Sequence, residues 1–202
     1  MRPVLVPGNQ VQARLRSRTE DQLAHAEIEL AHSRAPLLSE PLPAAAIDWL
    51  TVLTAAALPE GQPYPRLYDA LDALLALIEA APSALGWASQ LVRYELLMLA
   101  ELGFGLDLDS CAVTGSNDDL VAVSPRSGRA VSAAEAEPYA GKLLALPAFV
   151  REGGPASWTE IRDGLDLSGY FLMRDVLTGR SAGLAEARSR LVDRLLRAGG
   201  LI

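Results

Sequence analysis

The sequence of 202 residues predicts a mainly α protein, in which a helical domain with a short β-hairpin knob follows a small β segment. Two stretches near the N-terminus alternate apolar and polar residues, which is the period of a half-buried strand. A proline-rich stretch, residues 36–43, interrupts this pattern, and beyond it the leucines recur at the spacing of amphipathic helices. We therefore expect a β segment over residues 1–35, a linker over 36–43 and a helical domain over 44–202.

The two alternating stretches predict an antiparallel hairpin that turns at residues 19–22. The apolar positions that share one face are Val11, Ala13 and Leu15 in the first stretch and Ala26, Ile28 and Leu30 in the second. Arg14 and Arg16 fall on the polar face, where Glu27 and Glu29 could form ion pairs with them across the strands. The other interpretation is a basic strand that binds nucleic acid, and the sequence leaves both open. Because two strands are marginally stable alone in water, the hairpin must pack on a larger structure.

The remaining chain predicts a bundle of helices. The expected segments run from Ile47 to near Pro59, from Pro65 to Ala81, from about Ala84 to Leu102, from Tyr170 to Leu177 and from Leu184 to Leu195. The segment 84–102 is apolar on most faces, so we expect it at the centre of the bundle. A short hairpin is expected where residues 120–123 and 129–132 flank a turn. Capping boxes are expected at Ser132-Ala-Ala-Glu135 and at Ser157-Trp-Thr-Glu160.

The charge of the chain is unevenly distributed. Eighteen basic and 25 acidic residues give a net charge of −7, which taken whole argues weakly against nucleic acid. Residues 1–18 nevertheless carry +4 and residues 174–202 carry +3, so the segment between them carries −14. Both ends are therefore basic around an acidic middle, although exposed faces that merely differ in sign would give the same pattern.

Composition also points to a compartment. The sequence has one cysteine, Cys111, and lacks an apolar run long enough to span a membrane or a signal-peptide stretch at its start. A single cysteine cannot form a disulfide within the chain. We therefore expect a protein of the reducing cytoplasm.

Residues that could hold a metal do not form a convincing set. His25 and His32 lie seven positions apart without a neighbouring cysteine, so we expect them to be ordinary strand-edge histidines. The aspartates around the knob, Asp107, Asp109, Asp118 and Asp119, begin like a calcium-binding loop. Ala112 would then replace the turn glycine of that loop. Turn formation is the simpler role for these aspartates, and no metal site is predicted.

Catalytic residues are equally sparse. Cys111 has neither a helix-start context nor a histidine in its own domain, and Gly103-Phe-Gly105 is not followed by a strand-to-helix phosphate motif. No catalytic residue is predicted. Arg93 and Glu95 interrupt an apolar helix but point to different faces, so each must find a partner on a neighbouring helix or reach the surface. For Arg93, binding of a carboxylate ligand is the alternative.

Three stretches together resemble a known family. They are Tyr94-Glu-Leu-Leu-Met-Leu-Ala-Glu-Leu-Gly-Phe-Gly-Leu-Asp-Leu, Cys111-Ala-Val-Thr-Gly115 and Ser124-Pro-Arg-Ser-Gly-Arg-Ala-Val-Ser132. They are similar to the central helix, knob and hairpin of RecO recombination mediators, with the knob at about residues 106–132. Pro7-Gly8-Asn9 with the strand after it resembles the second half of the RecO oligonucleotide-binding (OB-fold) barrel, and Ser189-Arg190 resembles part of the last helix of that family.

The resemblance implies a function in DNA repair and homologous recombination. RecO proteins are non-enzymatic: they bind single- and double-stranded DNA, anneal complementary strands and help load recombinase onto DNA coated with single-stranded DNA-binding protein. They work in the cytoplasm at the nucleoid, with RecR and with the acidic tail of the coating protein as partners, and without a cofactor.

Two sets of arginines are the expected contact residues. Arg2, Arg14, Arg16 and Arg18 are our candidates for DNA binding, because arginines on a barrel strand can follow phosphates without reading sequence. An acidic peptide with an apolar end needs a hydrophobic groove beside a cation, and Arg93, Arg174 and Arg190 are our candidates for that cation.

Two departures from the family affect these expectations. Members that bind zinc carry paired cysteines around the knob, whereas Cys111 is matched here by Thr114, so no zinc is expected. The chain also begins where the family's barrel is half built, so we expect either that more barrel strands are encoded upstream of Met1 or that this is a shortened form with impaired DNA binding. A helical protein-binding adaptor without DNA affinity is the alternative function, and an enzyme ranks last.

Overall fold

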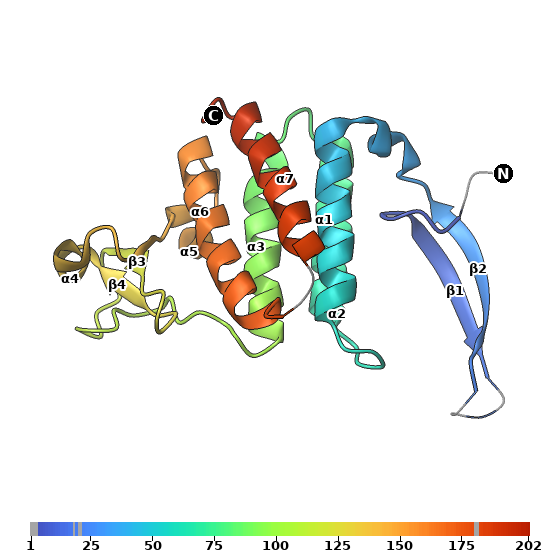
Figure 1. Cartoon of the computed structure of the whole chain (residues 1–202), viewed down its shortest axis with the longest axis horizontal. Helices are drawn as coiled ribbons and strands as arrows, with labels where there is room; N and C mark the ends of the chain where they lie inside the picture. The colour runs from blue at the N-terminus through green and yellow to red at the C-terminus, as the bar shows by residue number, and fades with distance from the viewer. Residues whose placement is uncertain (1–3, 18, 20–21, 180–181) are drawn as a thin grey trace.

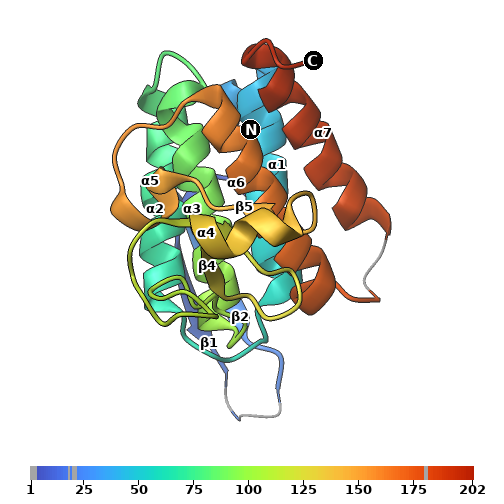
Figure 2. The same ribbon diagram turned by 90° about the vertical axis from the view of Figure 1, so that its left-hand side faces the viewer.

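The structure is a computed structural model that describes the chain except for residues 1–3, 18, 20–21 and 180–181. It is mainly α, as predicted: a bundle of helices carries a β-hairpin at one end and the knob at the other (Figure 1). Seen from the side that carries the knob, the knob lies in front of the helices and the hairpin behind them (Figure 2). No described helix is long and apolar enough to cross a membrane.

The N-terminal hairpin consists of β1 (Gln10–Arg16) and β2 (His25–His32), which pair antiparallel as predicted. Its register places Arg14 opposite Glu27 and Arg16 opposite His25. The cross-strand ion pairs that the sequence left open do not form, since neither arginine makes an ion pair with a described residue. Leu15 on the apolar face is 70% exposed, so the part of the hairpin away from its root packs on nothing in the described chain.

The expected linker at residues 36–43 is more ordered than the prolines suggested. A 3₁₀-helix, η1, spans Ala35–Ser39, and α1 (Pro41–Ala57) begins directly after it. Pro41 and Pro43 stand in the first turn of α1, where backbone N–H groups have no partner within the helix and proline is therefore tolerated.

Helix α2 spans Pro65–Ala80 and α3 spans Leu85–Glu101, close to their predicted bounds. The prediction that α3 is central is confirmed: it packs against α2 and α6, and Leu91, Val92 and Leu99 on it have no exposed surface.

The knob follows α3 and is built on a small antiparallel sheet. The sheet has the order β4-β3-β5, where β3 is Leu120–Val123, β4 is Ala130–Ser132 and β5 is Leu144–Ala145. Short helices α4 (Ala133–Ala136), η2 (Glu137–Tyr139) and α5 (Ala148–Glu152) complete the region.

The two predicted capping boxes differ in outcome. At Ser157 the box is confirmed, since its side chain accepts from the Glu160 backbone N–H and the Glu160 carboxylate accepts from the Ser157 backbone N–H. At Ser132 the prediction is wrong, because the side chain makes no cap bond and its hydroxyl instead lies 3.4 Å from Cys111 Sγ.

The last two helices close the bundle. Helix α6 (Trp158–Phe171) runs into a π-helical segment, η3 (Leu172–Val176), and α7 (Ala182–Ala198) packs mainly on α1. Gly199, just beyond α7, lies against the Trp158 ring so closely that a Cβ there would be 2.5 Å from a ring carbon. The two helices therefore approach each other near the C-terminus.

Candidate functional site

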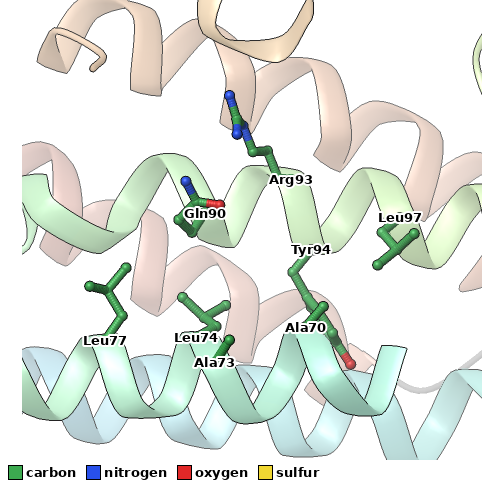
Figure 3. Close-up of a pocket in the computed structure, with 8 residues that line it drawn as sticks. All are labelled: Ala70, Ala73, Leu74, Leu77, Gln90, Arg93, Tyr94 and Leu97. Atoms are coloured by element: carbon green, nitrogen blue, oxygen red, sulfur yellow. The ribbon is translucent and has the colours of Figure 1, made fainter. Parts of the chain in front are cut away.

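An apolar groove runs between α2 and α3. It has a volume of about 360 Å³ and is lined by Ala70, Ala73, Leu74, Leu77, Gln90, Arg93, Tyr94 and Leu97 (Figure 3). Alanines at two α2 positions leave room that larger side chains would fill. Gln90 and Arg93, both on α3, form one rim of the groove, and the Arg93 side chain extends from α3 on the side away from α2 (Figure 3). We call this feature the α2–α3 groove.

Arg93 is placed to act as a cation at that rim. One guanidinium nitrogen, Nη2, donates to the Phe149 carbonyl oxygen, while Nε is buried and has no hydrogen-bond partner. Arg93 makes no ion pair with any residue that the structure describes. Its charge is therefore uncompensated beside an apolar surface, which is the arrangement that a ligand carboxylate would complete.

Tyr94 forms part of the groove and is itself held from below. Its hydroxyl lies 2.6 Å from Thr54 Oγ1 of α1. Burial raises the pKa of Tyr94 above its usual value, and this outweighs the opposite effect of the Thr54 hydrogen bond. The ring is thus a neutral, fixed wall.

The other two arginines predicted to bind a peptide already have partners. Arg174 donates to both oxygens of Asp175 at 2.7 and 2.8 Å and to the Pro125 carbonyl, and its guanidinium stacks 4.6 Å from the Phe171 ring centroid. It joins the knob turn to η3. Arg190 is exposed and lies 3.9 Å from Asp48. Of the three, Arg93 is the one that stands at an apolar groove without a carboxylate among the described residues.

The predicted DNA-binding arginines are described only in part. Arg2 and Arg18 lie outside the described residues. Arg14 and Arg16 are exposed on β1, and the nearest residue across from Arg16 is His25 rather than an acid. Arg16 therefore has no acid across from it, whereas Arg14 lies opposite Glu27 and beside Glu29, although it makes no ion pair with either of them.

Of the two outcomes that the sequence left open for Glu95, a partner on another helix or the surface, the structure shows the first. Glu95 is fully buried and accepts from Arg188 Nε at 3.0 Å and Nη2 at 2.8 Å, from Trp49 Nε1 at 2.8 Å and from the Ser168 hydroxyl. Arg188 Nη2 also donates to the Leu165 carbonyl at 2.7 Å. This polar cluster joins α1, α3, α6 and α7 inside the bundle.

Two structurally important arginines were missed. Arg188 shares the face of α7 that carries Leu184, Leu191 and Leu195, and this spacing could have marked it as buried. Arg34 is 4% exposed and donates to the Gly8 carbonyl at 3.0 Å and to Asp72 at 3.4 Å, which fastens the hairpin to α2. No local pattern marks Arg34.

No described group of three or more His, Cys, Asp or Glu residues is arranged to hold a metal ion. His32 Nε2 instead lies 2.8 Å from Glu79 Oε2 on α2. Cys111 is buried, and hydrogen bonds from Ser132 and Thr114 lower the pKa of its thiol to about 6.

The architecture thus defines a helical bundle with a β appendage, a knob and an apolar groove beside an uncompensated arginine. The family model for "Recombination protein O C terminal" matches residues 40–182. Proteins named "DNA repair protein RecO" align over nearly the whole chain. That of Rhodospirillum centenum is 46% identical over 98% of this chain and 79% of its own length, and that of Paracoccus denitrificans is 46% identical over 95% and 77%. That of Caulobacter sp. strain K31 is 43% identical over 100% and 82%.

The chain belongs to the RecO family of DNA repair proteins. Its general role is in DNA repair and recombination.

Proposed function

We propose that this protein is a recombination mediator: it binds single- and double-stranded DNA, anneals complementary strands and helps load recombinase onto DNA covered by single-stranded DNA-binding protein. The observation that carries the proposal is its membership of the RecO family over nearly its whole length. It acts by binding rather than by catalysis, on chromosomal DNA in the cytoplasm.

The exposed arginines of β1 support DNA binding. Arg14 and Arg16 make no ion pair within the described part of the chain, so each can release a phosphate counterion when DNA binds. Contacts of this kind do not read sequence, which suits a protein that acts on any strand. We propose that Arg14 and Arg16, together with Arg2 and Arg18, contact the phosphate backbone of the DNA.

The α2–α3 groove supports binding of a partner peptide. An acidic peptide that ends in an apolar residue would place that residue against Leu74 and Leu77 and its carboxylate near Arg93. The tail of single-stranded DNA-binding protein has this chemistry, and we propose it as the ligand. RecR is the other proposed partner.

A titration of labelled single-stranded DNA at increasing salt concentration tests the DNA assignment. Log affinity should fall linearly with log salt, with a slope of about −0.7 per phosphate neutralised on a single strand. Replacing Arg14 and Arg16 by alanine should reduce the slope by roughly 1.4 units. Arg66→Ala is a matched control, because Arg66 is also exposed but pairs with Glu101 on the helical bundle. Absent or salt-independent binding would refute the assignment.

The second candidate is an adaptor that binds protein partners without DNA affinity, and the acidic middle of the chain favours it. Measuring DNA binding and peptide binding on the same protein distinguishes the two functions. Arg93→Ala should weaken the binding of a synthetic acidic peptide with an apolar C-terminal residue by roughly tenfold to 100-fold. This factor corresponds to the loss of one hydrogen bond to a charged group. Arg190→Ala is the control. Peptide binding with no DNA binding would favour the adaptor.

A further inference from the structure

A second, smaller pocket lies where the root of the hairpin meets α2. Its volume is about 190 Å³ and its lining consists of Gly8, Asn9, Gln10, Val11, Arg34, Tyr68, Leu71, Asp72 and Leu75. A water molecule occupies about 30 Å³ in the liquid, so the pocket has room for roughly six waters, the scale of one planar ring system. We call it the hairpin pocket.

One face of α2 forms the floor and the mouth of this pocket. Tyr68, Leu71, Asp72 and Leu75 recur at helical spacing and therefore share that face. Leu75 is 6% exposed and forms the floor, whereas Tyr68 is 63% exposed and stands at the mouth. An aromatic ring with so much free surface beside an apolar floor is a stacking platform for a flat ligand.

The charges at the hairpin pocket disfavour an anion. Arg34 provides a cation, but Asp72 lies 3.4 Å from it in the same lining and Glu79 lies 3.4 Å from Arg34 Nε. A phosphate in the pocket would be repelled by the Asp72 carboxylate, whereas a neutral ring carries no charge to be repelled. Hydrogen-bonding groups for such a ring are present in the Gln10 amide and the Asp72 carboxylate.

We propose that the hairpin pocket holds one unpaired base of single-stranded DNA, stacked on Tyr68 with its polar edge against Gln10 and Asp72. This inference rests on the proposed DNA binding along β1. Arg14 and Arg16 follow Gln10 by four and six residues on the same strand, about 13 and 20 Å along it. A strand that places a base in the pocket can therefore continue past both arginines.

The test compares two DNA ligands of equal length and charge, an oligothymidylate and the same strand with abasic sites. The complete chain should bind the oligothymidylate more tightly, and Tyr68→Ala should weaken that binding by roughly fivefold to 100-fold while leaving the abasic strand unaffected. Tyr68→Phe keeps the ring and should retain the preference. Tyr139→Ala is the matched control, since Tyr139 is 53% exposed but lies in η2, directly after α4, on the opposite side of the molecule from the hairpin (Figure 1).

A photo-cross-link locates the base directly. A strand containing 5-iodouracil should cross-link to Tyr68, identified by mass spectrometry of the peptide that carries it. Equal affinity for the two ligands, a preference that survives Tyr68→Ala, or cross-links confined to other residues would overturn the pocket assignment while DNA binding itself stands. A chain that binds neither ligand would overturn the proposed function as well.

Discussion

The ion pair between Arg188 and Glu95 gives a sharp test of what holds α7 to the bundle. Arg188 donates two hydrogen bonds to the fully buried Glu95 carboxylate, and its own side chain is 11% exposed. Replacing it by methionine keeps much of the volume and removes the charge. Glu95 then retains Trp49 Nε1 and the Ser168 hydroxyl as donors, both of them neutral.

The expected cost is large because a buried charge loses its counterion. Breaking one partner of a buried pair typically destabilises a protein by about 3–5 kcal/mol. With a urea dependence of about 2 kcal/mol per molar, the midpoint of unfolding should fall by about 2 M. The double variant Arg188→Met/Glu95→Gln should recover most of this loss, because glutamine carries no charge and can still accept from Trp49.

Urea unfolding, followed by far-ultraviolet circular dichroism and by tryptophan fluorescence, measures the stability of the single and of the double variant. Trp49 donates directly to Glu95, so its emission should respond to the cluster itself. An Arg188→Met protein within about 1 kcal/mol of the wild type would refute the reasoning. So would a double variant as unstable as the sum of its two single changes, since the cost would then not come from an unpaired charge.

Three further changes test other parts of the fold. Gly169→Ala would place a Cβ 2.2 Å from Arg188 Nη1, so it should lower stability by about 1–3 kcal/mol, and an unchanged melting temperature would contradict this. Ser157→Ala removes the α6 cap and should cost about 1 kcal/mol in urea unfolding, with Ser127→Ala in the knob turn as a control. Hydrogen bonds lower the pKa of the Cys111 thiol to about 6, below the value of about 8.5 in an unfolded chain. The thiolate therefore stabilises the folded state fully above pH 8.5, and this stabilisation is lost as the pH falls towards 6. Cys111→Ala should flatten the decrease in the free energy of unfolding between pH 8.5 and 6, and an identical pH dependence in both proteins would disprove the effect.

The helices could be predicted because their evidence is local. The bounds expected for the second and third helices agree with α2 and α3 to within one or two residues, since Pro65 and the apolar repeat mark them directly. Alternation also predicted the hairpin and the residues that share each of its faces, but not its register, since Arg16 lies opposite His25 and Gln12 opposite Glu29. Capping was less predictable, because the Ser132 hydroxyl has a competing contact in Cys111, 21 positions away.

For the polar contacts between elements, the sequence could indicate which side chain needs a partner but not which residue provides it. The sequence left Glu95 either a partner on another helix or the surface, and it could not identify Arg188, which is 93 positions away, among the arginines of the chain. Arg34 gave no signal, because its partners Gly8 and Asp72 are brought to it by the docking of the hairpin on α2. The sequence likewise predicted a hydrophobic groove beside a cation, with Arg93 as one candidate. It could not place the groove between α2 and α3, because this position depends on how the two helices pack.

The two proposed ligands would use opposite faces of one helix. Ala70, Ala73, Leu74 and Leu77 of α2 face the α2–α3 groove, while Tyr68, Leu71, Asp72 and Leu75 face the hairpin pocket. The proposed function requires the protein to bind the tail of the coating protein and the DNA strand at the same time. Sites on opposite faces of a packed helix allow this, because neither ligand covers the contacts of the other. Their affinities should then be independent unless α2 itself moves, since any coupling between them would have to be reciprocal and carried by that helix.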